Sequence, residues 1–555
     1  MAAIPKPRFW HQYYPENLPT SLQYEPTTIP QALHRSAQRF ADRASLVFYG
    51  FPMSFSALDA QVNRFADVLA SLGVQKGERV AILLPNIPQF VVCNYGILRY
   101  GAVGVMANPL YTERELEHLL NDAGAQTLIA LDILAPRVQA ILPKTKLKRV
   151  IFTHLNDLIP LPEAMIPPGF FAPVPEQEGV FAFKDMMEKA SEAPFPDQSQ
   201  WDALALLIYT GGTTGVSKGV MLTHANLSCT VQQTLAFFSN VFKPGEDVAP
   251  AIYPFFHVGG HSVVQNTFIW NGATLHLIPR PEAKSLAQLL SQHRFTVFQA
   301  VPTLFVGLLQ EPAFQEADLS SIKIFGTGAA PMSGATYLAL KELAPQVMVT
   351  EGYGMTETGG LITSTPATAR FKQGSVGLPL PDTEVRIVDL ETGTQEMPLG
   401  QAGEVVVKGP QVMAGYYQRP DQTQEVFREG WLHTGDIGYL DEEGWLFLID
   451  RKKDMILASG YNIYPKEIDE VLYTHPDILE ACTVGIPDEY RGETVKVFIV
   501  RKSGSNLQAE EVEAFCREKL AAYKVPRLVE FVAELPKSAV GKILRRALRP
   551  EAPKG

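Results

Sequence analysis

The chain has 555 residues, of which 46% are hydrophobic and 19% are charged. This composition excludes dominant disorder, because so much apolar surface collapses into a core, and the length exceeds that of one compact domain. Asp and Glu outnumber Lys and Arg by 59 to 48, for a net charge of −11. We therefore expect a globular chain of several domains or subdomains that binds no nucleic acid.

Helix-like and strand-like segments alternate in the first part of the chain. Apolar spacing predicts a helix over residues 57–72 and a strand over 79–84, and then a helix over 113–122 and a strand over 127–131. This alternation favours α/β layers around a largely parallel sheet. The proline-rich stretch 160–196 is expected to be a surface loop.

A second alternating block runs from about 201 to 380, and a strand-rich section continues to about 450. Beyond Asp450 the pattern changes to a small α+β unit, with a helix that begins at Pro465 and another over 508–523. The charged segment 450–454 between the two parts is either a solvated linker or a hinge. The predicted fold is α/β: a large N-terminal domain of layered subdomains with a β-rich portion, followed by a small, mobile α+β domain.

The cysteines and the N-terminus bear on the cellular compartment. Four cysteines are scattered without CxxC spacing, which predicts reduced, buried thiols of a cytosolic protein. The N-terminus lacks the apolar core of a secretory signal. The most apolar stretch, 80–110, is interrupted by prolines and polar residues, so no transmembrane helix is expected.

Residues 209–219, YTGGTTGVSKG, are the most informative segment. Four glycines let backbone N–H groups converge on an anion, and the hydroxyls and Lys218 add further donors. The Walker A pattern fails, because no glycine directly precedes Lys218 and a strand rather than a helix follows. Two alternatives are a plain hairpin and a hydrolase elbow with Ser217 as nucleophile, but an elbow also needs a following helix.

Three further segments contain chemically suggestive residues. Glycines flank Tyr353, which leaves its ring free to stack on a base, and Glu357 suits a Mg²⁺ ion held on a nucleotide. Asp436 in HTGD can accept both hydroxyls of a ribose. Lys542 lies in the loop PKSAVGK. Taken singly, the Glu357 and Asp436 segments could also be ordinary turns with solvated carboxylates, and an exposed lysine such as Lys542 is usually just a solvated charge.

Six motifs in one order resemble the adenylate-forming superfamily of acyl-CoA synthetases, luciferases and peptide-synthetase adenylation domains. They are YTGGTTGVSKG, GTGAAP, EGYGMTE, HTGD, DRKKD and PKSAVGK, spread over nearly the whole chain. Within the superfamily the chain is most similar to bacterial long-chain fatty-acid–CoA ligases. That similarity rests on WHQYYPENLP, NPLYTERELEHLLNDAGA and VFREGWLHTGD together with DRKKDMILASGYNIYP.

The resemblance implies roles for individual residues. The ATP phosphates would contact Thr210, Gly211, Gly212, Thr213, Thr214, Gly215 and Lys218, and adenine would lie among Gly328, Ala329, Glu351, Gly352 and Tyr353. Thr356 would contact the α-phosphate, Glu357 with Thr210 would hold Mg²⁺, and Asp436 with Arg451 would bind the ribose. Lys453 would be the hinge, Lys542 the catalytic lysine of adenylation, and Gly460 with Tyr461 part of the CoA channel.

The chain departs from the family pattern at three positions. Many relatives have Ser where this chain has Gly211, and Pro where it has Ser217. One hydroxyl donor of the phosphate loop is therefore missing and another stands further along. Several relatives carry Lys where Leu457 stands, so Leu457 is assigned no nucleotide contact.

The segment YPFFHVGGH matches the part of the family that borders the acyl tunnel. The resemblance implies an acyl pocket formed by Phe255, Phe256, Gly259 and Gly326, with His257 as a catalytic residue at the border of the acyl tunnel. His257 and His261 are four residues apart, which on a helix could ligate a metal, but no third ligand is evident. Two ordinary, partly buried histidines remain the alternative.

The implied activity is ATP-dependent conversion of a long-chain fatty acid to acyl-AMP and then to acyl-CoA. Alternatives are a medium-chain or aryl acid, a carrier-protein acceptor, a serine esterase, or a nucleotide-binding protein without turnover. The resemblance further implies domains at 1–450 and 456–555 with a hinge at 451–455. It also implies Mg²⁺ and CoA as cofactor and co-substrate, a homodimer, and a cytoplasmic protein peripheral to the inner face of the membrane.

Overall fold

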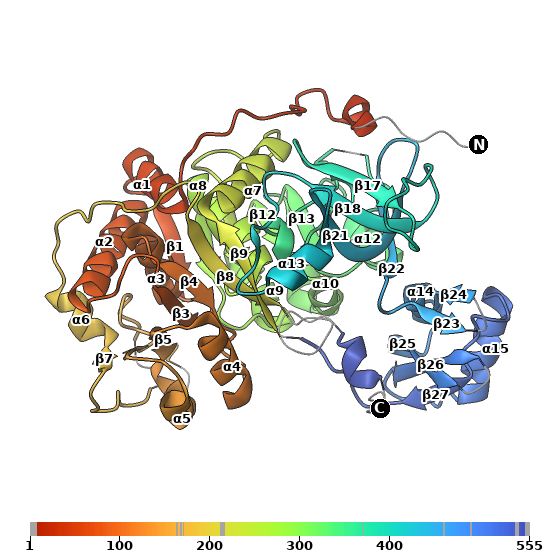
Figure 1. The fold of residues 1–555 in the computed structure, drawn as a ribbon. Helices are drawn as coiled ribbons and strands as arrows, with labels where there is room; N and C mark the ends of the chain where they lie inside the picture. The colour runs from red at the N-terminus through yellow and green to blue at the C-terminus, as the bar shows by residue number, and fades with distance from the viewer. Residues whose placement is uncertain are drawn as a thin grey trace.

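The computed structural model describes residues 8–162, 165–166, 169, 171–210, 217–368, 370–458, 461–488, 491–538 and 543–549. These residues form five β-sheets with helices packed between and around them (Figure 1). Four sheets lie in the part of the chain up to Arg451, and the fifth belongs to a separate C-terminal unit that follows β22.

The largest sheet has the strand order β19-β9-β8-β4-β3-β5-β6-β7. The strands from β3 to β8 run parallel, whereas β9 and β19 are antiparallel additions at one edge. Their bounds are β3 (Arg79–Leu83), β4 (Val103–Met106), β5 (Thr127–Leu131), β6 (Arg149–Thr153), β7 (Val180–Ala182), β8 (Leu204–Thr210), β9 (Lys218–Thr223) and β19 (Gly415–Tyr416).

Helices cover both faces of this sheet, as a parallel sheet requires. Val80 and Ile82 of β3 join the hydrophobic core beneath α2 and α3, whereas Ala81 and Leu83 join the core beneath α4 and α5. Alternate side chains of one strand thus face two different cores. The helices are α2 (Phe55–Ser71), α3 (Pro88–Tyr100), α4 (Glu113–Ala123), α5 (Ala135–Ile141) and α6 (Phe183–Lys189).

Two further sheets complete the α/β part of the large domain. One has the order β10-β11-β1-β2 and the other β12-β13-β14-β15-β16. The strands are β1 (Ala44–Phe48), β2 (Phe51–Ser54), β10 (Val248–Ala251), β11 (Thr274–Leu277), β12 (Val297–Gln299), β13 (Ile324–Gly328), β14 (Met348–Tyr353), β15 (Thr363–Ser364) and β16 (Leu378–Pro379). Accompanying helices are α1 (Ile29–Arg39), α7 (His224–Phe237), the π-helix η5 (Gly259–Asn266), α8 (Thr267–Trp270), α9 (Ala283–Gln292), α10 (Pro302–Leu308), α11 (Pro312–Gln315) and α12 (Gly334–Leu343).

The β-rich portion is an antiparallel sheet of strand order β17-β18-β21-β20, with β22 also paired to β21. The N-terminal turn η1 (Phe9–Tyr13) lies near it (Figure 1), and Trp10 shares a hydrophobic core with Trp445, the residue directly before β22. The elements are β17 (Glu384–Val388), β18 (Gly403–Lys408), α13 (Pro420–Val426), β20 (Phe427–Arg428), β21 (Trp431–Leu440) and β22 (Leu446–Arg451).

The C-terminal unit has its own sheet and its own hydrophobic core. Helices α14 and α15 pack on a sheet of order β24-β23-β26-β25, with β27 paired to β26. The elements are β23 (Ile456–Ala458), β24 (Tyr461–Ile463), α14 (Pro465–Tyr473), β25 (Ile478–Asp488), β26 (Gly492–Arg501), α15 (Ala509–Lys519), β27 (Leu528–Phe531) and η7 (Arg545–Leu548).

The fold class agrees with the sequence prediction, and two local predictions are wrong. The stretch expected to be a surface loop contains β7 and α6, because Phe183 and Met187, one helical turn apart, are buried against the core below α2. The helix expected over 508–523 ends at Lys519, because Leu520 adopts extended backbone.

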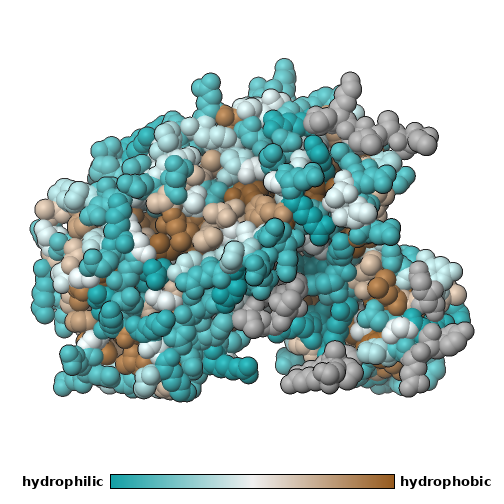
Figure 2. All heavy atoms as spheres, in the orientation of Figure 1, coloured by the Kyte–Doolittle hydropathy of each residue, from teal (hydrophilic) through white to brown (hydrophobic). Residues whose placement is uncertain are grey.

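The visible surface is mostly hydrophilic, with apolar residues showing mainly in recesses of the large domain and on the small one (Figure 2). In the described residues, no helix has the length and hydropathy needed to cross a bilayer. The four cysteines are free and buried, as predicted.

Candidate active site

The base of the predicted phosphate loop is formed by two paired residues. Thr210 ends β8 and Lys218 begins β9, and the two are directly opposite in an antiparallel ladder. Gly211, Gly212, Thr213, Thr214 and Gly215 lie outside the described residues. Because a strand follows, the segment lacks the strand–turn–helix context of a hydrolase elbow around Ser217.

Lys218 and Glu357 both contact Tyr416, the ammonium over its ring and the carboxylate at its hydroxyl. The Lys218 ammonium lies 4.9 Å from the centroid of the Tyr416 ring, and the Tyr416 hydroxyl donates a 2.8 Å hydrogen bond to Oε1 of Glu357. Glu357 is only 6% exposed, in the short helix η6 (Thr356–Thr358) that follows β14. Burial raises the pKa of this carboxyl, and the Tyr416 hydrogen bond opposes that rise. Thr356 is buried beside it.

The residues predicted to surround adenine lie at the ends of β13 and β14. Parallel pairing aligns Thr327 with Glu351 and Gly328 with Gly352, so strand ends from distant parts of the sequence become neighbours. Ala329 follows with φ +66°, a conformation that costs a non-glycine residue energy and often marks a functional turn. These backbones therefore form one continuous rim.

The two large side chains on this rim, Glu351 and Tyr353, are both buried. Burial raises the pKa of Glu351 to about 7. Tyr353 was expected to have a ring free for stacking, but the residue is 8% exposed and its hydroxyl donates a 2.7 Å hydrogen bond to Oδ2 of Asp436. The ring is therefore fixed by the β-rich sheet, and its contact with a base stays a prediction.

Asp436 and Arg451 are brought together by sheet register. They are opposite each other in the β21–β22 ladder, and Nε of Arg451 lies 3.2 Å from Oδ1 of Asp436. The carboxylate thus receives one neighbour on each oxygen, Tyr353 on one and Arg451 on the other. This arrangement fixes its orientation at the point where β22 leads into the C-terminal unit.

Three of the predicted acid-site residues, Phe255, Phe256 and His257, lie between β10 and η5, and Gly259 begins η5. Phe255 is fully buried with its ring 5.6 Å from that of Phe90, whereas Phe256, His257 and Gly259 are partly buried. Gly326 lies on β13 opposite Gln299 of β12. Their roles in holding an acyl chain stay predictions.

His261 is a core residue that bonds to buried amides. Its Nε2 lies 3.1 Å from Oδ1 of Asn94, and its Nδ1 lies 3.3 Å from Nδ2 of Asn266. Burial lowers the pKa of His261 to about 3. Among the residues that the structure describes, no three His, Cys, Asp or Glu side chains gather as a metal site.

The C-terminal unit contains the remaining predicted residues. The Lys453 carbonyl accepts a 3.0 Å hydrogen bond from Arg549, and burial lowers the pKa of the Lys453 ammonium. Tyr461 is 54% exposed and stacks on Tyr523 with ring centroids 4.4 Å apart. Gly460 and Lys542 lie outside the described residues.

The C-terminal segment is also tied to the large domain. Arg545 pairs with Asp469 of α14 and lies 3.8 Å from Asp450 at the end of the β-rich sheet. Lys466 of α14 donates its backbone N–H to Asp450 at 2.7 Å and its ammonium to the Leu448 carbonyl at 2.6 Å. These contacts hold the small domain against β22.

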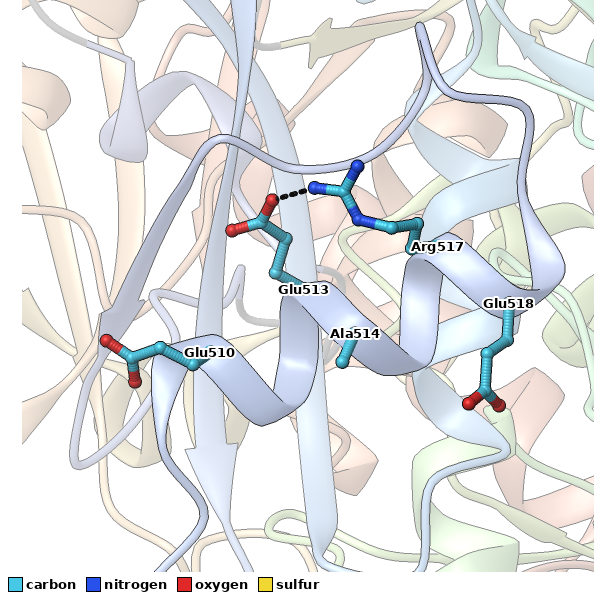
Figure 3. A pocket seen from close by; sticks show the side chains of 5 residues that line it. All are labelled: Glu510, Glu513, Ala514, Arg517 and Glu518. Atoms are coloured by element: carbon cyan, nitrogen blue, oxygen red, sulfur yellow. Dashed lines mark hydrogen bonds and ion pairs between the residues drawn. The ribbon is translucent and has the colours of Figure 1, made fainter.

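A surface hollow on α15 is separate from these residues. It is lined by Glu510, Glu513, Ala514, Arg517 and Glu518 of that one helix (Figure 3). Glu513 and Arg517 pair one turn apart, and Figure 1 places α15 on the side of the small domain away from the large one. We assign it no part in the site.

Sequence reasoning missed two residues that organise the site. Asn86 donates hydrogen bonds to the carbonyls of Ala251 and Tyr253, at 2.8 and 2.9 Å, and accepts one from Phe255 N–H at 2.8 Å. A buried-strand pattern followed, three residues after β3 ends, by an asparagine in the turn before α3 was the available signal. Nothing in the sequence singled out Tyr416, since its link to Glu357 spans 59 residues.

Comparison with known protein families identifies the family to which this chain belongs. The family described as AMP-binding enzyme matches residues 33–417, and the AMP-binding enzyme C-terminal domain matches residues 467–542. The chain belongs to the AMP-binding enzyme family. The predicted resemblance to this superfamily is therefore confirmed.

The chain is also similar over nearly its whole length to individual AMP-binding enzymes. The chain is 40% identical to long-chain-fatty-acid–CoA ligases of Bacillus subtilis (strain 168), over 549 residues, and of Escherichia coli O6:H1, over 563 residues, covering 98% of each chain in both cases. The ATP-bound crystal structure of MatB from Rhodopseudomonas palustris superposes with a TM-score of 0.83 at 29% identity, covering 94% of this chain and 98% of that one. The predicted similarity to bacterial long-chain fatty-acid–CoA ligases is confirmed.

Proposed function

We propose that this AMP-binding enzyme is a long-chain fatty-acid–CoA ligase, which forms acyl-AMP from ATP and then transfers the acyl group to CoA. The observation that carries the proposal is the 40% identity to named ligases over 98% of both chains. The clustering of Lys218, Glu357 and Asp436 with their partners around the predicted ATP site supports it.

The first half-reaction joins the acid to AMP. A carboxylate oxygen of the fatty acid attacks the α-phosphorus, the bond from that phosphorus to the bridging oxygen breaks, and pyrophosphate leaves. Lys218 would neutralise charge on the phosphates, Thr356 would orient the α-phosphate by a hydrogen bond, and Asp436 with Arg451 would hold the ribose. Lys542 would lie between the carboxylate and the α-phosphate. His257 would border the carboxylate, with Phe255, Phe256, Gly259 and Gly326 around the acyl chain.

Glu357 fits a Mg²⁺ site on ATP. In the described part of the chain, its carboxylate accepts a hydrogen bond from Tyr416 on Oε1, and we propose that Oε2 serves the ion together with the Thr210 hydroxyl. One carboxylate is a common protein contribution where nucleotide phosphates complete the coordination. When bound, Mg²⁺ neutralises charge on the leaving pyrophosphate.

The second half-reaction forms the thioester. The CoA sulfur, after loss of its proton, attacks the acyl carbon, and the bond from that carbon to the AMP oxygen breaks. We propose that residues 1–450 and 456–555 alternate between two orientations about 451–455, pivoting at Lys453. In the second orientation Gly460 and Tyr461 would border the CoA channel. A homodimer and peripheral contact with the inner face of the membrane stay proposals from the same resemblance.

Separate assays of the two half-reactions test the assignment of the lysine. Lys542→Ala is expected to abolish acyl-AMP formation from ATP and palmitate but to spare palmitoyl-CoA formation from supplied palmitoyl-AMP. Ser217→Ala, at the position a serine esterase would need, is expected to keep both. Equal loss of both half-reactions in Lys542→Ala would reject its role, and loss of activity only in Ser217→Ala would favour the esterase.

A further inference from the structure

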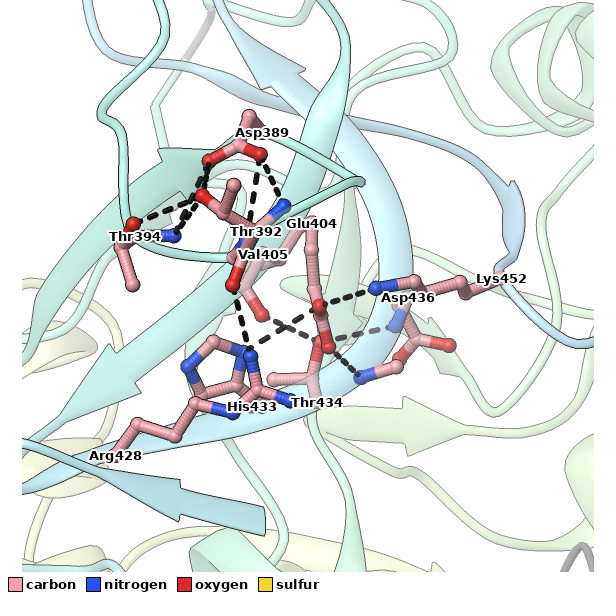
Figure 4. Close-up of polar contacts among 12 residues, drawn as sticks. Asp389, Thr392, Thr394, Glu404, Val405, Arg428, His433, Thr434, Asp436 and Lys452 are labelled. Atoms are coloured by element: carbon pink, nitrogen blue, oxygen red, sulfur yellow. Dashed lines mark hydrogen bonds and ion pairs between the residues drawn. The ribbon is translucent and has the colours of Figure 1, made fainter. Parts of the chain in front are cut away.

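Glu404 is a buried carboxylate beside the predicted ribose site. It lies on β18, is only 4% exposed, and has three neighbours (Figure 4). Its Oε1 accepts a 3.2 Å hydrogen bond from Gly435 N–H, and its Oε2 lies 3.1 Å from the Lys452 ammonium and 3.4 Å from Nδ1 of His433. A buried carboxylate needs such partners to offset its lost hydration.

The hydrogen bond to Gly435 fills a gap in the sheet. The β18–β21 register shifts between Glu404 and Val406, and Gly435 has φ +72°, so the ladder is interrupted at this turn. The Thr434 hydroxyl donates to the Val405 carbonyl at 2.7 Å and accepts from Asp436 N–H at 3.1 Å. Glu404 thus satisfies the backbone N–H directly before Asp436 and helps to hold the turn that presents this residue.

Through Lys452, Glu404 also contacts the beginning of the predicted hinge, residues 451–455. The Lys452 N–H also donates to the Gly435 carbonyl at 2.9 Å, so its backbone and its side chain both bind the large domain. The next two carbonyls, of Lys453 and Asp454, instead accept hydrogen bonds from Arg549 of the C-terminal segment. Lys452 is therefore bonded to the large domain, whereas Lys453 and Asp454 are bonded to the C-terminal segment, and the change falls between Lys452 and Lys453.

We propose that Glu404 is a positioning residue that joins the ribose-binding turn to the fixed end of the hinge. It touches neither substrate nor reacting atoms, and it acts through Asp436 on one side and Lys452 on the other. By holding Lys452 to the sheet it confines rotation to Lys453, so that each domain orientation is reached without disturbing the bound nucleotide. This proposal rests on the proposed two-step ligase reaction.

Three variants separate the two actions of Glu404. Lys452→Gln removes only the hinge contact and is expected to lower kcat for palmitoyl-CoA formation about fivefold, the scale of a partly exposed ion pair, with KM for ATP unchanged. Glu404→Gln keeps an acceptor for the Gly435 N–H, so its kcat and its KM for ATP should be the same as those of Lys452→Gln. Glu404→Ala should in addition raise KM for ATP about tenfold, because it leaves the Gly435 N–H at the ribose turn without any acceptor.

Two measurements test the coupling against a merely structural role. The double variant Glu404→Gln, Lys452→Gln should be no slower than either single one, because both remove the same interaction. Lys408→Gln, an exposed site on the same strand, should leave kcat and KM unchanged. Additive losses in the double variant, or losses that follow the melting temperature alone, would overturn the proposal.

Amide hydrogen exchange tests the proposal without turnover. Glu404→Ala should speed exchange in peptides covering 433–437 and 452–455, whereas Lys452→Gln should speed it only in 452–455. The same pattern in both variants, or none, would overturn the positioning role. Absence of palmitoyl-CoA from the wild-type enzyme, with the expected exchange pattern, would reject the ligase function and leave the contact network standing.

Discussion

The phenol of Tyr416 donates a 2.8 Å hydrogen bond to the carboxylate of Glu357, 59 residues earlier in the chain. Tyr416 lies on β19, at the edge of the eight-stranded sheet beside β9, whereas Glu357 follows β14 of another sheet. Since Lys218 lies against the same ring, one tyrosine connects the base of the phosphate loop with the proposed Mg²⁺ ligand.

Tyr416→Phe tests this connection. The variant keeps the ring under Lys218 but leaves a buried carboxylate without its donor, so the pKa of Glu357 should rise further and acyl-AMP formation should slow about tenfold. The Mg²⁺ concentration for half-maximal rate should rise as well. Pyrophosphate release measured over a Mg²⁺ series checks this result, with Tyr417→Phe as the matched control. An unchanged Mg²⁺ dependence would separate Tyr416 from the metal site.

Tyr353→Phe tests how Asp436 is held for the ribose. The variant removes the 2.7 Å hydrogen bond to Asp436 while it keeps the buried ring. We expect KM for ATP to rise about tenfold, as for loss of a hydrogen bond to a charged group, with little change in KM for the fatty acid. Steady-state kinetics with Tyr439→Phe as the control checks this. A larger change in KM for the fatty acid than in KM for ATP would show that Tyr353 acts on the acid site and would contradict its role at the ribose.

Glu351 makes stability depend on pH in a defined direction. Its pKa rises from 4.5 to about 7 on burial, so between these values the folded chain binds more protons than the unfolded chain. Its contribution to the free energy of unfolding therefore falls as pH rises from 4.5 to 7 and is constant above that range.

Glu351→Gln removes this titration. The free energy of unfolding of the variant relative to wild type should increase from pH 5 to pH 8 by about 2.5 kcal/mol, since most of the shift is titrated within this range. Urea unfolding at the two pH values measures the difference. A variant whose relative stability is the same at both would show that Glu351 is ionised throughout.

Asn86 holds the chain segment before η5 by three hydrogen bonds. Asn86→Ala should lower the free energy of unfolding by ~2 kcal/mol, since it leaves buried backbone groups unpaired. Because the segment leads into Phe256 and His257, KM for the fatty acid should also rise severalfold while KM for ATP stays unchanged. Asn86→Asp, which retains an acceptor for Phe255 N–H, should be intermediate in stability. Unchanged KM for the acid in both variants would separate Asn86 from the acyl pocket.

The sequence predicted what depends on local pattern and on motifs. The strand at 127–131 and the helix beginning at Pro465 follow directly from periodicity and capping, and the motif order identified the family. Contacts between residues far apart in the chain could not be predicted from local pattern. The register that sets Asp436 opposite Arg451 and the partners of Glu404 arise when the strands of the β-rich sheet pair, and the Tyr416–Glu357 contact arises only when two separate sheets assemble. The helix at 183–189 was missed because flanking prolines hid two anchoring residues, Phe183 and Met187.

The most direct test of the proposed ligase is AMP formation from MgATP with saturated acids from C6 to C18 and with 4-coumarate, each with and without CoA. We predict CoA-dependent AMP release with kcat/KM highest for C14 to C18 acids, together with the matching acyl-CoA. Activity confined to short or aromatic acids would contradict the long-chain assignment. Acyl-AMP that forms without transfer to CoA would point to a carrier-protein acceptor, and no AMP from any acid would contradict the ligase itself.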